Sequence, residues 1–408
     1  MSASVAALKS HAVIVGAGPV GAVAALLLAR HGIRVTLLER NSALVSASRA
    51  STFHPSTLDL LRSLGIDLAG HRAATTVTSL QWRNRDGEVL AELDYRLLIG
   101  LTSHPFRIHL DQQVLLDRLA ELIADEPGVD LVCDTEVIAL DAARAVVTAV
   151  SADGLRQTLK GDVIVGCDGS HSLIRQQAGL QLSVLPYPTV ALRAYVETNL
   201  SALLPGSAPR PLSNLCYFRG GGDGVSVLRM GNVTRLIVRS SAHRADERRV
   251  AEAVAKATPW SLDSIAVQRI DSYRLGRGVV DSYLSDLGPV LVIGDAAHVT
   301  STSGGMNMNS GIHDAFALMP ALAGRLRGGA DLLGVAHIAE ERRRYMLHDV
   351  IPRTERVVRG LQDLAGPSLV TDLHGLAPLI ANRAAHRNFL IEASLLDAPL
   401  AGLESITK

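Results

Sequence analysis

Aromatic residues are scarce in this sequence, with 5 Phe, 2 Trp and 7 Tyr among 408 residues. The hydrophobic share of 48% and the charged share of 20% are nonetheless typical of a globular protein and exclude a disordered or fibrous chain. At ~100–200 residues per domain, the length allows two or three domains. Their cores must be built from Leu, Val, Ile and Ala.

Cysteine is almost missing as well. Cys133, Cys167 and Cys216 are odd in number, lie far apart and form no Cys-x-x-Cys pair or Cys/His cluster. The pattern argues against a disulfide framework and against a structural zinc site. We therefore predict a reducing, cytoplasmic environment and no metal.

The sequence also lacks an excess of either charge and any long apolar run. Its 40 Lys and Arg residues balance 40 Asp and Glu residues, so no basic surface for nucleic acid is expected. The most apolar stretch, Val20–Ala29, has half of the ~20 residues that a membrane-spanning helix needs. We expect neither a nucleic-acid partner nor an integral membrane segment.

A glycine-rich turn near the N-terminus is the first positive signal. Gly16, Gly18 and Gly21 form a GxGxxG pattern between the β-branched run His11–Val15 and an Ala/Leu-rich helix, and Glu39 ends the next strand. In such βαβ units the glycines allow a tight turn and close approach to a pyrophosphate, while the acid accepts a ribose hydroxyl. The unit predicts a dinucleotide site, but it does not separate NAD from FAD.

Two aspartates follow later buried strands. Asp168 lies in Gly166-Cys167-Asp168-Gly169 and Asp295 in Gly294-Asp295-Ala296-Ala297-His298. Ligands of open α/β sheets bind at the carboxyl ends of parallel strands, and a flavin needs an acid there for its ribityl hydroxyls. The alternative is that each aspartate caps the helix that follows it.

The middle of the chain has a different pattern. Apolar and polar residues alternate in Thr76–Tyr95 and again between Val184 and Arg277, which predicts an antiparallel sheet with one wet face and one helix near Asp246–Ala257. The fold class is therefore α/β: a Rossmann-like dinucleotide-binding domain, an inserted antiparallel-sheet domain and a helical C-terminal segment. The predicted boundaries are 1–74, 106–182 and 278–366 for the first, 75–105 and 183–277 for the second, and 367–408 for the third.

Taken together, these segments resemble the FAD-dependent class A monooxygenases, the para-hydroxybenzoate hydroxylase-like aromatic hydroxylases. The resemblance covers roughly Ser10 to Leu361. It implies that the Rossmann-like domain is an FAD-binding domain and that the inserted antiparallel sheet is the substrate-binding domain. It implies that Arg49 contacts the FAD pyrophosphate and that Gln112 faces the ribityl chain, although Gln113 leaves that register open by one. The full set of cofactor-binding residues that it implies is Gly16, Gly18, Gly21, Glu39, Arg40, Arg49, Gln112, Asp168, Gly169, Asp295, Gly305, Met308 and Asn309.

The loop after His298 departs from the family pattern. Ser301 and Thr302 replace the usual Pro-Pro pair, and Asn307 replaces a usual glycine. We expect a looser wall of the substrate chamber and a left-handed backbone at Asn307, which asparagine tolerates. The candidates on this loop are Ser301, Thr302, Ser303 and His298, although His298 is better explained as a packing residue than as a catalytic base.

The resemblance also implies an activity. FAD is reduced by NADH or NADPH and reacts with dioxygen to give a flavin hydroperoxide, which hydroxylates an aromatic or conjugated small molecule. The alternatives are another flavoprotein chemistry on this fold, such as a prenyl-chain reductase or an epoxidase, and a catalytically silent FAD-binding scaffold. A halogenase is a weaker alternative, because its tryptophan-containing motif is missing.

Four residues of the inserted sheet are substrate candidates: Arg193, Tyr195, Tyr217 and Arg219. The run Gly220–Gly224 precedes a strand and not a helix, so we predict a hairpin there and no phosphate loop. The charged run Glu340–Arg344 is predicted to be a solvated helix face. We expect the apolar C-terminal segment, 367–408, either to pack on its own chain or to mediate a homodimer.

Overall fold

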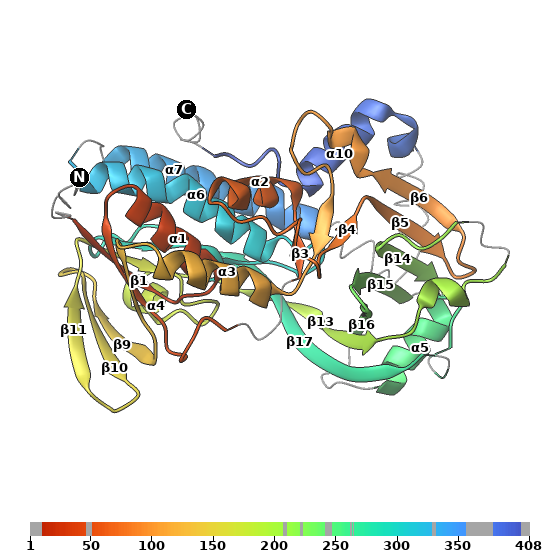
Figure 1. Ribbon diagram of the computed structural model, residues 1–408, viewed down its shortest axis with the longest axis horizontal. Helices are drawn as coiled ribbons and strands as arrows, with labels where there is room; N and C mark the ends of the chain where they lie inside the picture. The colour runs from red at the N-terminus through yellow and green to blue at the C-terminus, as the bar shows by residue number, and fades with distance from the viewer. Residues whose placement is uncertain are drawn as a thin grey trace.

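The computed structural model describes residues 10–45, 51–206, 210–220, 223–240, 247–261, 263, 265–328, 332–355 and 378–400. A parallel sheet with its covering helices forms one part, and a large, mostly antiparallel sheet forms the other (Figure 1). Strands β13 (Leu185–Val196) and β17 (Val267–Val279) run from the first part into the second. The predicted α/β class is confirmed, with the second sheet inserted.

The five-stranded parallel sheet has the strand order β18-β12-β1-β2-β8. It forms because its central strands are short apolar runs that can be buried on both sides, as parallel sheets require. In β1, for example, four of the five side chains are buried, and only His11 at its start is partly exposed. The strand bounds are β1 His11–Val15, β2 Arg34–Leu38, β8 Val129–Val132, β12 Val163–Gly166 and β18 Val290–Val292.

The first βαβ unit follows the prediction closely. Helix α1 (Pro19–Arg30) starts with a proline, which is favourable at a first helical position, and Gly32 follows its end with a φ of +79°. A Cβ on Gly16 would lie 2.5 Å from the carbonyl oxygen of Cys167, and one on Gly21 would lie 1.9 Å from that of Gly16. These two glycines therefore allow the turn to pack against the end of β12.

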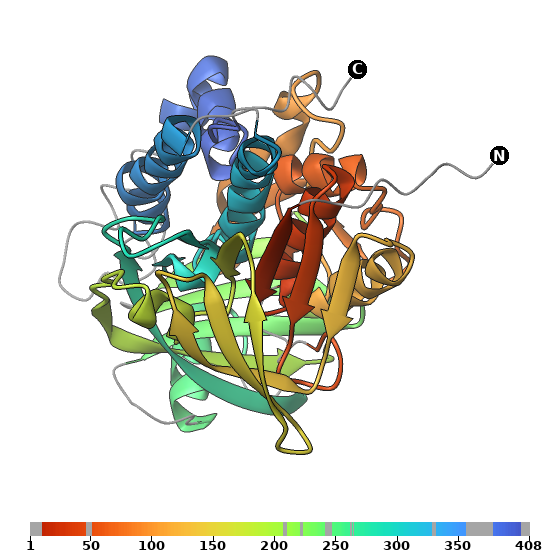
Figure 2. The same cartoon turned by 90° about the vertical axis from the view of Figure 1, so that its left-hand side faces the viewer.

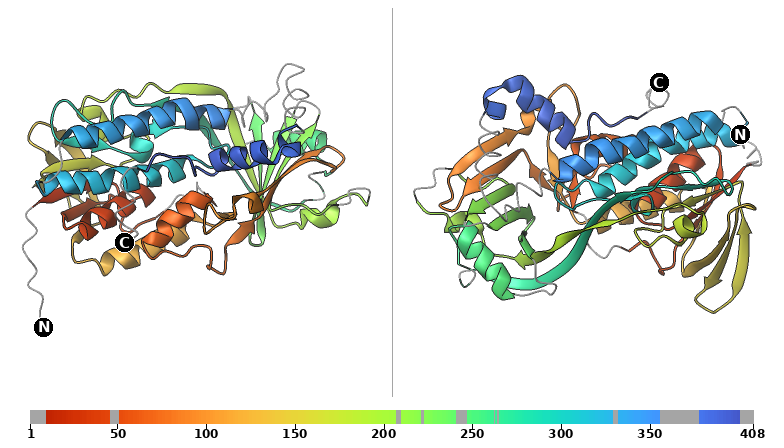
Figure 3. Two further views of the ribbon diagram at one scale, coloured as in Figure 1. Left: turned by 90° about the horizontal axis from the view of Figure 1, so that it is seen from above. Right: turned by 180° about the vertical axis from the view of Figure 1, so that it is seen from behind.

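Helices cover the parallel sheet. Helix α1 packs against α3 (Gln112–Ala124) and against α6 (Asn307–Leu326), which lies beside α7 (Leu332–Tyr345) (Figures 1 and 3). A three-stranded antiparallel sheet contributes Val147 to the same core. Its strands are β9 Thr135–Asp141, β10 Val146–Ser151 and β11 Arg156–Lys160 (Figure 2).

The large sheet has the order β19-β17-β13-β16-β15-β14-β5-β6. One of its faces packs on α5 (Glu247–Ala257) through residues such as Leu192 and Val254. It is not a simple meander, because β13 lies between β17 and β16, and β14 pairs with β5 in parallel. The remaining bounds are β5 Ser79–Asn84, β6 Val89–Asp94, β14 Leu215–Gly220, β15 Asp223–Met230, β16 Val233–Ser240 and β19 His298–Val299.

Short elements connect the two parts. A small antiparallel sheet consists of β3, β7 and β4, and the C-terminal helix α10 packs Leu390 against Tyr95 and Leu98, so the described part of the tail is helical and lies on its own chain. The bounds of these and the other short elements are β3 Thr52–Phe53, β4 Thr75–Val77, β7 Arg107–His109, α2 Pro55–Ser63, α4 Leu173–Gln177, η1 Tyr95–Leu98, η2 Leu200–Leu203, η4 Gly294–Ala296, η5 Met346–Val350 and α10 Arg383–Ala393.

One local prediction has a clear outcome. The hairpin at Gly220–Gly224 is confirmed by the antiparallel pairing of Gly220 with Asp223. Helix α6 begins at Asn307, and Gly311 within it allows close packing: a Cβ there would lie 2.9 Å from the Cα of Gly294. Among the described residues, no helix is both long and apolar enough to cross a membrane.

Candidate functional site

The carboxyl ends of four adjacent parallel strands bring the predicted cofactor residues together. In the order β18-β12-β1-β2, these ends carry Asp295, Asp168, the Gly16 turn and Glu39. Ligands of open α/β sheets bind at this edge. The sequence motifs, far apart along the chain, therefore line one continuous edge.

The turn between β1 and α1 fits a dinucleotide. Gly18 has a φ of −65°, which any residue adopts, and nothing lies within 4 Å of a Cβ built on it. Neither backbone nor protein packing therefore requires glycine there, whereas a ligand lying against the turn would. No side chain caps the N-terminus of α1, and the Oε2 atom of Glu39 accepts a hydrogen bond from the amide of Ala17 at 2.9 Å. A pyrophosphate on the helix N-terminus and a ribose beside Glu39 suit this arrangement.

The two aspartates have different surroundings. The carboxylate of Asp168 accepts hydrogen bonds from the Ser172 hydroxyl and from the amide of Ile174 at 3.1 Å, so it supports the start of α4. These contacts agree with the alternative prediction, in which Asp168 caps the helix that follows it. Burial raises the pKa of the Asp168 carboxyl. Asp295 is exposed at the start of the loop after β18. Its carboxylate is thus accessible to a ligand at the sheet edge.

The loop before α6 is held by side chains from several elements. Gly304 and Gly305 have φ values of +85° and +68°, and the Nε2 atom of His54 lies 2.8 Å from the carbonyl oxygen of Gly304. No side chain caps α6 at Met306, so its first amides, including that of Met308, are left for another partner. His54 carries no sequence signal that marks it for this contact.

Two asparagines stabilise the same loop. Asn307 is helical and not left-handed, so the predicted backbone is wrong: the positive φ values belong to Gly304 and Gly305 before it. Its Oδ1 atom accepts hydrogen bonds from the amide and the hydroxyl of Thr300, at 3.0 and 2.6 Å. Asn309 is fully buried and donates to the carbonyl oxygens of Thr52 and Gly305. Its side chain therefore orders the loop, and only its backbone is available to a ligand.

His298 packs as expected. It has no exposed surface, and its Nε2 atom lies 2.7 Å from Oδ2 of Asp314. Arg342 also pairs with Asp314 and is fully buried. The prediction of a solvated face for the run Glu340–Arg344 is therefore wrong for Arg342, because a buried carboxylate on α6 draws it inward.

The four substrate candidates divide into two pairs. Arg193 and Tyr195 share a face of β13, where the guanidinium of Arg193 lies 5.2 Å from the Tyr195 ring and forms an ion pair with Asp271 at 3.2 Å. Tyr217 and Arg219 are on β14, three strands away at ~4.8 Å per strand. The Tyr217 ring packs 5.4 Å from that of Trp82, in a hydrophobic cluster. The structure therefore does not bring all four together.

Arg239 on β16 joins the sheet to the loop and was not among the predicted residues. Its Nη2 atom donates to the hydroxyl oxygens of Ser303, at 2.6 Å, and Ser301, at 3.2 Å. The hydroxyls of Tyr273 and Thr302 lie 3.3 Å apart. These bonds link the loop to the large sheet at the position of the missing prolines, and the looser wall stays a prediction. The alternation of residues along β16 could have predicted that Arg239 lies on the polar face of the sheet. It could not have predicted the contact of Arg239 with the loop.

Three predicted residues remain less defined. Gln112 begins α3, while the side-chain amide of Gln113 donates to the carbonyl oxygen of Leu44 at 2.9 Å, which leaves Gln112 as the better candidate. Arg40 is exposed after β2. Arg49 lies outside the described residues.

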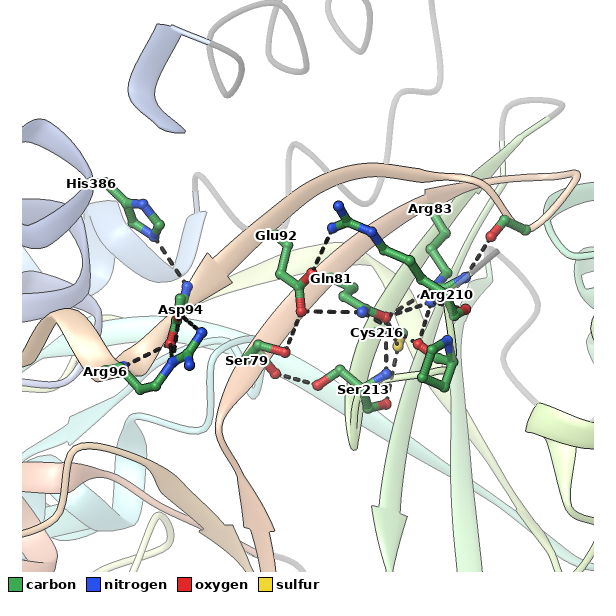
Figure 4. Close-up of polar contacts among 12 residues, drawn as sticks. Ser79, Gln81, Arg83, Glu92, Asp94, Arg96, Arg210, Ser213, Cys216 and His386 are labelled. Carbon is green, nitrogen blue, oxygen red and sulfur yellow. Dashed lines mark hydrogen bonds and ion pairs between the residues drawn. The ribbon is translucent and has the colours of Figure 1, made fainter. Parts of the chain in front are cut away.

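A separate cavity of about 1110 Å³ lies along β5 and the edge strand β6 of the large sheet. Figure 4 shows its polar contacts, in which the buried Arg83 donates to Gln81 and to the carbonyl oxygens of Gly87 and Arg210. Glu92 accepts hydrogen bonds from Ser79 and Gln81. None of its lining residues comes from the glycine turn or from the loop before α6, so this cavity is not part of the candidate site.

Comparison with known proteins identifies the family. A family model described as an FAD binding domain matches residues 9–350. The chain belongs to this family. The 6-methylpretetramide 4-monooxygenase of Streptomyces rimosus is 31% identical over 338 residues, which cover 77% of this chain and 75% of that protein. The para-nitrophenol 4-monooxygenase of Pseudomonas sp. (strain WBC-3) is 24% identical over 395 residues, covering 94% and 95%.

Solved structures share the fold. The crystal structure of p-nitrophenol 4-monooxygenase from Pseudomonas putida DLL-E4 matches with a TM-score of 0.84 and 22% identity, over 95% of this chain and 99% of that one. The protein is an FAD-dependent monooxygenase of the aromatic hydroxylase family, and the use of NAD(P)H and dioxygen follows from the family. The predicted resemblance is confirmed.

Proposed function

We propose that the edge formed by β18, β12, β1 and β2 holds FAD and that the protein hydroxylates an aromatic ring placed between the loop before α6 and the large sheet. Gly18, Glu39 and the N-terminus of α1 would bind the ADP half, and Asp295 and Gln112 the ribityl chain. When bound, FAD would accept hydride from NAD(P)H and activate dioxygen. The observation that carries the proposal is the open space beside Gly18, where no protein atom lies within 4 Å of a Cβ. This space adjoins Glu39, which accepts a hydrogen bond from the amide of Ala17.

The residues around the ring site have distinct tasks. The uncapped amides at the start of α6 would stabilise negative charge that develops nearby, since a helix N-terminus is electropositive. The sheet face with Arg193 and Tyr195 would orient the substrate and exclude water. An aromatic substrate is supported by the relatives, one named for nitrophenol and one for methylpretetramide.

The test uses the full chain loaded with FAD. We expect visible flavin absorption, oxidation of NADH or NADPH that phenols stimulate, and one labelled oxygen atom in the product when the dioxygen is isotopically labelled. Flavin that neither coenzyme reduces would support a silent scaffold. Reduction without incorporation of oxygen would support a reductase. Either result would overturn the proposal.

Two further properties stay predictions. A cytoplasmic location is tested by fractionating the native cells, and a homodimer by light scattering of the purified protein. Comparing the rates with NADH and NADPH determines which coenzyme is preferred.

A further inference from the structure

Arg239 is a buried arginine whose guanidinium uses only one of its nitrogens in hydrogen bonds to the described residues. It is 9% exposed, and both of its hydrogen bonds leave from Nη2 and end on the neutral hydroxyls of Ser301 and Ser303. A guanidinium has five N–H donors. Among the described residues it has no further hydrogen bond and no carboxylate within ion-pair distance.

In the part of the chain that the structure describes, no carboxylate is among the groups that interact electrostatically with Arg239: these are the phenols of Tyr273 and Tyr187. Asp271 on β17 pairs instead with Arg193 and Arg269, at 3.2 and 3.3 Å. Burying a charge without a counter-charge is costly, and burial lowers the pKa of Arg239. An anion bound there would remove that cost.

The strand register places small residues beside this side chain. Ala191 pairs with Arg239 on one side. On the other side, Val225 pairs with Val238, so the next position along places Gly224 beside Arg239. The residues beside Arg239 on both neighbouring strands are therefore small, and Ser301 and Ser303 hold its guanidinium against the loop.

We infer that Arg239 binds an anionic oxygen carried by the aromatic substrate, such as an ionised phenol, and so selects acidic aromatic substrates. This inference rests on the proposed function. Ser301 and Ser303 position the guanidinium, and its remaining donors face the substrate. A planar guanidinium is well suited to oxyanions because its donors form a rigid fork.

The test measures binding to the FAD-loaded protein at a pH where the phenol is ionised. The probes are 4-nitrophenol, its neutral methyl ether 4-nitroanisole, and 4-nitrobenzoate, which distinguishes a phenolate from a carboxylate. We expect Arg239→Gln to weaken binding of the preferred anion at least tenfold and binding of the ether less than twofold. Arg229→Gln removes an exposed charge from the same sheet and should change neither.

Several outcomes would overturn the inference. Equal weakening of anion and ether would show that Arg239 only shapes the site, and an unchanged affinity or no anion binding by the wild type would reject its role. If Arg239→Gln loses FAD, Arg239→Lys keeps the charge and should retain part of the anion preference. Failure of the proposed function is separate, because it appears as missing turnover and not as a changed ratio of binding constants.

Discussion

The guanidinium of Arg342 on α7 donates from Nε to Oδ1 of Asp314 on α6 at 2.9 Å, and neither side chain has exposed surface. The other oxygen of Asp314 lies 2.7 Å from His298 and accepts a bond from the amide of Gly294. Burial alone would raise the pKa of Asp314, but His298 and Arg342 outweigh it and lower the pKa. This carboxylate therefore ties two helices to the turn that carries Asp295.

Removing Arg342 should strongly destabilise the protein. Arg342→Ala leaves the Asp314 carboxylate buried without one of its two ion-pair partners, and breaking a buried pair typically costs about 3–5 kcal/mol. Arg343→Ala is the matched control, because its pair with Glu340 is near the surface and such pairs contribute roughly 0–1 kcal/mol. Urea unfolding measures both free energies. Similar losses for the two variants would contradict the buried network.

The same pair shows where sequence reasoning stops. The glycine turn was predictable because its signal is local: a strand, three glycines, a helix and a terminal acid lie in one short segment. Arg342 lies among charged residues, and its burial depends on a carboxylate that the fold brings from another helix. Sequence spacing does not reveal that partner.

The site shows the same limit. Alternation predicts strands, yet it does not say that β13 lies between β17 and β16, because that pairing joins distant segments. The contact between Arg239 and Ser303 depends on this arrangement. The roles of the cofactor residues, by contrast, could be inferred from motifs, and they remain predictions to be tested.

Gly18→Val should separate FAD binding from folding. The backbone at Gly18 suits any residue and a Cβ meets no protein atom, so the unliganded protein should unfold at nearly the same urea concentration as the wild type. Its affinity for FAD, measured by flavin fluorescence, should fall at least tenfold, because the side chain would occupy the ligand's space. Gly206→Val, also in open space, is the control. Full FAD binding by Gly18→Val would reject this placement.

Asn307 should stabilise the loop through its side-chain oxygen. Asn307→Ala removes three hydrogen bonds to Thr300, two accepted by Oδ1 and one donated by Nδ2, and should cost about 1–3 kcal/mol. Asn307→Asp keeps an acceptor in the same position and should lose much less. Thermal unfolding of the FAD-free protein compares the variants. An equal loss in both would show that the oxygen is not what matters.

Buried histidines should make the protein less stable in mild acid. His109 is fully buried, its Nδ1 atom lies 2.9 Å from the carbonyl oxygen of Arg229, and burial lowers its pKa to about 4. In the unfolded chain a histidine has a pKa of about 6.5, so the unfolded state binds more protons between these two values. The stability contribution is therefore complete above about pH 6.5 and falls by roughly 1.4 kcal/mol per pH unit as the pH drops towards 4.

Replacing His109 tests this dependence on pH. His109→Gln should reduce the slope of the unfolding free energy against pH by that amount, because glutamine does not titrate in this range. His348→Gln, at an exposed position, is the control for the substitution itself. Urea unfolding at several pH values between 4 and 7 measures the slope, and an unaltered slope in His109→Gln would contradict the assignment.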